Sequence, residues 1–170
     1  MRIGTFVVKI WRWSSIAFVI GALGWTYSLL PDMVAFNFSE TGLADSYINR
    51  DVIFYIVMGL FLVNNVVISS LVKAVPRIDV QMLPILNKET WVKNRAHLNE
   101  LIINWIYCII AGVNTMIGLS LFSLATVNSN QFTMDIFDFS WLFYIGVLLM
   151  ILVFLLPLRL LWPPAPQEEL

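Results

Sequence analysis

Four long apolar blocks make up most of this chain, and each is bounded by polar or charged residues. None has a Lys, Arg, Asp, Glu or His near its middle. About 20 apolar residues in a helix span the roughly 30 Å hydrocarbon core of a bilayer, because a helix rises ~1.5 Å per residue. The sequence therefore predicts an all-α membrane protein, a four-transmembrane-helix bundle in one membrane domain, 1–170. The predicted spans are 11–30, 52–72, 101–124 and 141–161.

The composition agrees with lipid as the solvent. Charged residues are 12% of the chain and hydrophobic residues 59%, whereas a soluble domain carries about 25% charged residues. The net charge of −1 gives no basic surface for nucleic acid. The chain has one His and the single Cys108, too few for a metal-ligand spacing. It has no recognised nucleophile, P-loop or dinucleotide motif. We therefore expect no enzyme activity, no metal and no cofactor.

Basic residues are distributed unevenly along the chain. Nine of the ten Lys and Arg lie in the N-terminal flank, in or beside the loop 73–100, or at the end of the fourth block, and Arg50 is the exception. Under the positive-inside rule, both termini, the short tail 163–170 and the loop 73–100 are expected in the cytoplasm. The segments 31–51 and 125–139 are then expected on the outer face. These outer segments carry the acidic residues Asp32, Glu40, Asp45, Asp51, Asp135 and Asp138.

The outer segment 31–51 is polar and turn-rich although it joins two apolar blocks. Pro31 stops a helix because proline lacks the N–H donor and clashes with the preceding turn. Residues 34–38 are mostly apolar, which favours a short extended stretch. Gly42 permits a turn with positive φ. The segment is thus expected to be an ordered loop, either a ligand-binding element or a lid over one end of the bundle.

The end of this segment contains two candidate helix caps. Asp45 or Ser46 could cap a short helical turn that leads to Arg50. Asp51 could cap the second span by offering its carboxylate to the free amides of the first helical turn.

Two runs of residues carry a family resemblance. The outer segment fits the pattern L-P-x-x-V-P-x-H-F-N-x-x-G-x-x-D-x-[WY] at Leu30, Pro31, Val34, Phe36, Asn37, Gly42, Asp45 and Tyr47. The loop 73–100 fits P-N-K-E-Y-W-x-x-x-x-R-R at Pro84, Asn87, Lys88, Glu89, Trp91 and Arg95. Together they resemble the bacterial polytopic membrane proteins of the family called domain of unknown function 1648. The chain departs from the first pattern, because Ala35 alone replaces P-x-H and the histidine is missing.

The resemblance implies a multi-pass protein of the bacterial cytoplasmic (inner) membrane. The family's relatives include the immunity and signalling membrane protein of the Sdp toxin system. The first hypothesis is therefore a non-catalytic sensing or immunity-like protein that binds a ligand or a protein partner through its outer segment. Without the histidine, proton chemistry is not expected there. The expected binding residues are Pro31, Phe36, Asn37, Gly42, Asp45 and Tyr47.

Two other functions stay open. The small size and apolar spans also fit an accessory subunit of a larger membrane complex, with a membrane-protein partner or self-association in the bilayer. A transporter is less favoured, because a transport pathway usually contains a buried ionisable group. In the loop 73–100, a solvated His97 is favoured over a catalytic one.

Four asparagines interrupt the second and third apolar blocks. A side-chain amide in hydrocarbon is costly unless it is hydrogen-bonded, so each is expected to face another helix. Interhelical bonding is favoured over a polar pathway through the membrane. The four residues are Asn64, Asn65, Asn104 and Asn114.

Overall fold

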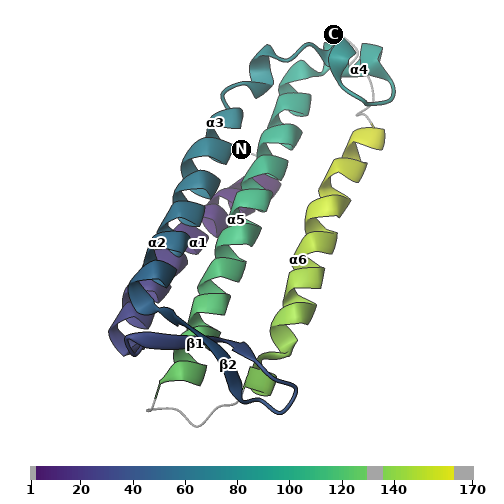
Figure 1. Cartoon of the computed structure of the whole chain (residues 1–170). Helices are drawn as coiled ribbons and strands as arrows, with labels where there is room; N and C mark the ends of the chain where they lie inside the picture. The colour runs from purple at the N-terminus through teal and green to yellow at the C-terminus, as the bar shows by residue number, and fades with distance from the viewer. Residues whose placement is uncertain (1–2, 130–135, 163–170) are drawn as a thin grey trace.

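The computed structural model describes residues 3–129 and 136–162, and its longest elements are helices (Figure 1). Four helical stretches are long and apolar enough to span a membrane, which confirms that part of the predicted architecture. They are Ile3–Leu29, Arg50–Arg77, Arg95–Asn128 and Ile136–Leu161. The predictions for Asp135 and for the tail 163–170 lie outside the described residues.

The described residues form six α-helices and one pair of strands. The helices are α1 (Ile3–Leu29), α2 (Arg50–Leu62), α3 (Ser69–Leu71), α4 (Lys88–Lys93), α5 (Arg95–Asn128) and α6 (Trp141–Leu158). The strands are β1 (Met33–Phe38) and β2 (Ala44–Asn49). Short turns of 3-10 helix cover Val75–Arg77, Val80–Met82, Ile136–Phe139 and Arg159–Leu161.

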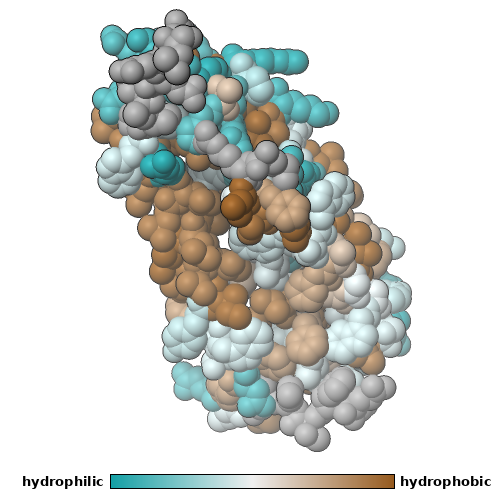
Figure 2. Space-filling view, turned by 180° about the vertical axis from the view of Figure 1, so that it is seen from behind, coloured by the Kyte–Doolittle hydropathy of each residue, from teal (hydrophilic) through white to brown (hydrophobic). Residues whose placement is uncertain are grey.

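Helix α5 is the centre of the bundle. It packs against α1 over much of its length and against α6 on another side, and in Figure 1 it lies between α2 and α6. The hairpin of β1 and β2 crosses one end of the bundle, here called the hairpin end. Helix α4 lies at the opposite end, here called the loop end. Figure 2 shows an apolar surface along the middle of the molecule and hydrophilic residues toward both ends.

The first and third spans are longer than predicted. Helix α1 begins at Ile3 instead of residue 11, and α5 runs from Arg95 to Asn128 instead of 101–124. The prediction counted apolar residues, whereas a helix continues through polar residues as long as its backbone bonds are made. The α1–α5 contact includes one close approach, because a Cβ added to Gly118 would overlap the ring of Phe18.

The outer segment folds as an antiparallel hairpin. Helix α1 ends just before Pro31, and Gly42 has a φ of 80°, as the sequence predicted. The expected extended stretch is β1, but the helical turn expected from Asp45 is wrong, because residues 44–49 form β2. The physical reason is that pairing with β1 satisfies backbone groups that an isolated helical turn would leave without hydrogen bonds. The exposure of the residues alternates along β2, as is typical of a strand.

The cap of α2 also differs from the prediction. Asn49 is the N-cap, and its side-chain oxygen accepts a hydrogen bond from the backbone N–H of Asp51 at 2.8 Å. The carboxylate of Asp51 instead accepts a hydrogen bond from the hydroxyl of Tyr27 at 2.9 Å. Asp51 therefore joins α2 to α1 in place of capping its own helix.

The second span is not a regular α-helix. After α2 the chain forms a π-helical segment, Val63–Ile68, and then the single turn α3. A π-helix adds residues to a turn and is often associated with functional sites. Here it contains both Asn64 and Asn65.

Candidate functional site: a groove beneath the hairpin

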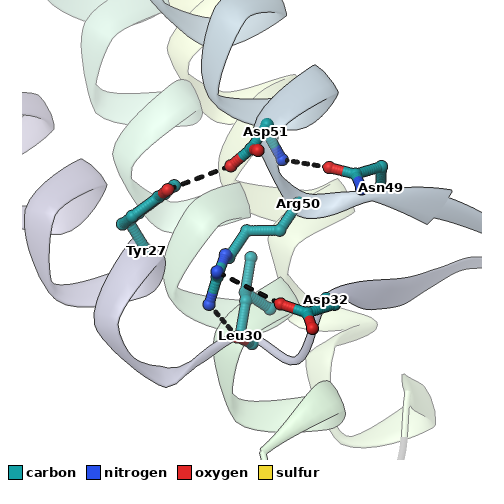
Figure 3. A network of polar contacts seen from close by, with 6 residues as sticks. All are labelled: Tyr27, Leu30, Asp32, Asn49, Arg50 and Asp51. Atoms are coloured by element: carbon teal, nitrogen blue, oxygen red, sulfur yellow. Dashed lines mark hydrogen bonds and ion pairs between the residues drawn. The ribbon is translucent and has the colours of Figure 1, made fainter.

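The base of the hairpin is tied to α1 and α2 by Arg50 (Figure 3). Its Nη2 lies 3.2 Å from Asp32 Oδ1, and its Nη1 donates a hydrogen bond to the carbonyl of Leu30 at 2.9 Å. The guanidinium also stacks 4.7 Å from the ring centre of Tyr27. A planar fork with several donors can hold such different partners at once. The hairpin is thus fixed where it leaves the bundle.

A second tie joins β1 to the last turn of α5. The side-chain oxygen of Asn128 accepts the N–H of Ala35 at 2.7 Å, and its Nδ2 donates to the carbonyl of Ala35 at 3.0 Å. The amide therefore pairs with β1 as a neighbouring strand would. Val34 and Ala35 are buried beneath this contact.

Two irregularities in the strand pairing change the direction of the side chains. Ala35 pairs with Tyr47 and Asn37 with Ser46, so Phe36 is an extra residue on β1. Phe38 pairs with Ala44, so Asp45 is an extra residue on β2. Bulges of this kind redirect side chains next to binding sites. Phe36 and Phe38 both line the same groove in the bundle.

This groove has a cavity volume of about 620 Å³. Its floor is α5, its walls come from α2 and α6, and Phe36 and Phe38 close its hairpin end. The volume falls within the ~300–1,000 Å³ typical of small-molecule sites. The wall residues are Ile53, Val57 and Leu60 of α2, and Gly146, Leu149, Met150 and Val153 of α6.

The floor of the groove is unusually open for a central helix. Val113 lies in the middle of α5 yet is 42% exposed. A Cβ added to its neighbour Gly112 would meet no atom within 4 Å. Both residues line the groove, so the space beside them is not filled by protein side chains. The hydroxyls of Ser120 and Ser123 are the polar side chains of a lining that is otherwise apolar.

The structure separates the six binding residues expected in the outer segment. Phe36 lines the groove. Pro31, Gly42 and Tyr47 line a shallower hollow on the hairpin, together with Val127 and Asn128 of α5. Asn37 and Asp45 are exposed and line neither space. The sequence did not identify Phe38, which lines both spaces, or Asn128, which ends an apolar block and gave no signal beyond its polarity.

The hairpin end carries an excess of acidic residues. The described residues there include Asp32, Glu40, Asp45, Asp51 and Asp138 against the single cation Arg50, a balance of −4. Asp32 is paired with Arg50, and Asp51 accepts the bond from Tyr27. Glu40 and Asp45 are exposed. Their carboxylates make no hydrogen bond or ion pair with the described residues.

Three asparagines and a serine meet inside the bundle. Asn64 and Asn65 each donate a hydrogen bond to Asn114 Oδ1 at 2.9 Å. Asn114 Nδ2 donates to Asn65 Oδ1 at 3.0 Å and to Ser15 Oγ at 3.3 Å. Asn64 also donates to the carbonyl of Ile110 at 3.0 Å. The prediction that these amides bond across helices is confirmed.

The positions of these side chains along their helices explain why they meet. Ser15, Asn64 and Asn114 each lie fourteen residues from the hairpin-end terminus of their own span. At ~1.5 Å per residue, all three are about 21 Å from that end. They form one polar layer among α1, the second span and α5, at a depth beyond most of the groove.

Asn104 belongs to a separate cluster at the loop end. Its Nδ2 donates a hydrogen bond to Thr5 Oγ1 at 2.8 Å, and Thr5 donates in turn to Glu100. His97 Nδ1 lies 3.9 Å from Glu100 Oε2, and the His97 side chain is 13% exposed. His97 is therefore more buried than the solvated surface residue that the sequence favoured, because it packs beside the ring of Trp91.

The motif of the loop 73–100 holds the loop onto the bundle. Trp91 is fully buried against Val80 and Leu98, and its Nε1 donates to the carbonyl of Leu160 at 3.2 Å. Arg95 donates to the carbonyls of Val75, Pro76 and Ile78.

The other motif residues begin α4. Asn87 has a φ of 53° at its start, Lys88 donates to the carbonyl of Gln81 at 2.6 Å, and Glu89 is exposed in the first turn. These contacts fit a folding role for the motif better than a ligand site.

Among the described residues, no three His, Cys, Asp or Glu side chains lie together in a way that could hold a metal ion. No family model, curated protein or solved structure matches the chain. The groove and the hairpin above it are therefore interpreted from their own geometry.

Proposed function

We propose that this protein is a non-catalytic, multi-pass protein of the bacterial inner membrane that binds an amphipathic ligand at its hairpin end. The observation that carries the proposal is the groove of about 620 Å³ lined by Phe36 and Phe38 of the hairpin. Its apolar lining suits a hydrophobic chain, and the polar, acidic hairpin above it suits a head group. The proposed binding site therefore includes the helices beneath the outer segment as well as the segment itself.

The rigid attachment of the hairpin supports a binding role. Arg50 and Asn128 fix β1 and β2 to three helices, so Phe36 and Phe38 are held over the groove without further ordering. A site that is formed in advance loses less conformational entropy when a ligand binds. The sensing or immunity-like role predicted from the family resemblance would use this binding event as its signal.

A cavity-filling variant tests the proposal. Gly112→Leu places a side chain in open space within the groove, and Gly59→Leu places the same side chain on an exposed position of α2 outside it. We expect native mass spectrometry of protein extracted in lipid nanodiscs to find a bound amphipathic molecule in the wild type and in Gly59→Leu, and none in Gly112→Leu. Equal retention in both variants would contradict the proposal.

The same extract tests the accessory-subunit alternative. A subunit of a larger complex would be extracted with a second protein in fixed stoichiometry, whatever side chain occupies position 112. A ligand that depends on Gly112 and the absence of such a protein would favour the binding role.

A further inference from the structure

We propose that the ligand of the groove is a cationic amphiphile with a single hydrocarbon chain, whose chain lies along α5 and whose head group lies at the acidic hairpin end. This inference rests on the proposed function and specifies the class of its ligand. It follows from the width of the groove, from its lining and from the charge beside it.

The dimensions of the groove suit an extended chain. The lining residues of α5 extend from Ile109 to Val127, a separation of eighteen residues or ~27 Å at ~1.5 Å per residue. A volume of about 620 Å³ along this length describes a long, narrow groove. Such a shape suits a single extended hydrocarbon chain.

The apolar lining alone does not select a ligand. Lipid tails are as apolar as leucine, so a chain gains little when it moves from the bilayer into an apolar groove. Phospholipid chains are also present in large excess. The groove can therefore prefer one molecule over the surrounding lipid only through that molecule's head group.

The charge at the hairpin end determines which head group is preferred. Asp45 is the extra residue on β2, and its neighbours Ala44 and Ser46 pair with Phe38 and Asn37. It therefore lies across the strand pair from Phe38, which lines the groove. Glu40 lies two residues beyond Phe38, in the hairpin turn. Arg50 is already paired with Asp32, so these carboxylates attract a cation and repel an anionic head group.

Photo-crosslinking with matched probes tests the inference. The full chain is placed in phosphatidylcholine nanodiscs that contain a trace of a hexadecyl probe with a diazirine near the chain end. Three probes differ only in the head group: trimethylammonium, maltoside or sulfate. Mass spectrometry then measures labelling of the lining residues of α5 and α6. We expect the ammonium probe to label them more than the sulfate probe, by up to about fivefold, the upper end of what one exposed ion pair supports.

Two sets of variants separate the chain from the head group. Gly112→Leu, or Val113→Phe as a second way to fill the groove, should remove the labelling, and Gly59→Leu should not. Glu40→Gln with Asp45→Asn should bring the ammonium and sulfate probes to equal labelling.

The outcomes distinguish the two proposals. Equal labelling of the wild type by all three probes, or a preference for sulfate, would overturn the cationic ligand and leave the binding function standing. Labelling that persists in both Gly112→Leu and Val113→Phe would overturn the binding function as well.

Discussion

At the scale of single residues, two hydrogen bonds join Asn65 and Asn114 inside the bundle. The two amides bond reciprocally, at 2.9 and 3.0 Å. Asn114 also accepts from Asn64, so Asn114→Leu removes an acceptor from the buried donor of Asn64 and the half-buried donor of Asn65. An unsatisfied buried donor costs ~1–3 kcal/mol. We expect Asn114→Leu to lower the free energy of unfolding by about that amount.

A double-mutant cycle isolates the reciprocal bond. Asn65→Leu and Asn114→Leu should couple by ~0.6 kcal/mol and by no more than ~1.7 kcal/mol, the range found between membrane helices. Unfolding in mixed detergent micelles provides the measurement. Asn65→Leu combined with Asn104→Leu is the control, because Asn104 bonds to Thr5 in another cluster. A coupling of zero in the first pair would show that the amides do not stabilise the bundle.

At this scale the sequence predicted which polar residues would pair but not with which partners. Amides within apolar blocks have to bond across helices, and that requirement is visible in the chain. The choice of Asn114 as the shared partner depends on equal depth in three helices and on the π-helix around Asn64. The π-helical turn contains both Asn64 and Asn65, which bond to Asn114 of α5, and the local sequence does not show this turn.

Among the elements, the hairpin is joined to α5 by the two hydrogen bonds of one side chain. Asn128 makes both hydrogen bonds from α5 to Ala35. We expect Asn128→Ala to release β1 from α5 and to increase hydrogen exchange at Ala35 and its neighbours, while the helices keep their protection. Ligand retention by the groove should fall as well, because Phe36 and Phe38 are then less ordered.

Asn128→Asp is a useful companion to that experiment. Its carboxylate can still accept the N–H of Ala35 but cannot donate to the carbonyl. An intermediate increase in exchange is expected. If Asn128→Ala left exchange at Ala35 unchanged, the tie to α5 would not hold the hairpin.

Trp91 joins helix α4 to the 3-10 turn that follows α6. We expect Trp91→Phe to keep most of the packing and to lose the bond from Nε1 to the carbonyl of Leu160, at a cost of about 1 kcal/mol. Trp91→Ala should cost ~3–5 kcal/mol, because a fully buried aromatic side chain is removed. Thermal unfolding measures both variants. Val92→Ala is the control, because Val92 follows in α4 and is 49% exposed.

The sequence predicted the long helices better than the short elements. Long apolar runs identify spans because burial in lipid requires them. The sequence predicted only one strand of the hairpin. At Asp45 it predicted a helical turn, because a helical turn depends on neighbouring residues, whereas strand β2 depends on pairing with β1 earlier in the chain. Trp91 and Arg95 were identified as part of a motif. Only the structure shows that they hold the loop 73–100 against the bundle.

For the whole molecule, the main prediction concerns its orientation in the membrane. The excess of basic residues at the loop end and of acidic residues at the hairpin end predicts that the hairpin faces outward. A Cys108→Ser background removes the single native thiol, which is buried. In that background we expect Glu40→Cys to react with a membrane-impermeant thiol reagent in intact cells and Lys88→Cys to react only after permeabilisation. The reverse pattern would invert the topology.

The groove is a property of the whole molecule and could not be predicted from any segment. It exists because α2 and α6 lie on either side of α5 without filling the space between them. An unfilled space leaves no positive signal in a sequence. The structure places Gly112 on the floor of the groove with open space beside it.

The π-helix in the second span has a consequence for how this chain tolerates changes in length. It accommodates about one residue more than an α-helix of the same rise, so the residues after it are turned by roughly 100° relative to a regular continuation. Deleting one residue from Val63–Ile68 would remove the extra residue, so a regular α-helix would still present Ser69 to Arg12, to which it now bonds at 2.9 Å. A one-residue deletion there that keeps Asn64 and Asn65 should therefore disturb the rest of the span less than a one-residue deletion within the regular helix α2.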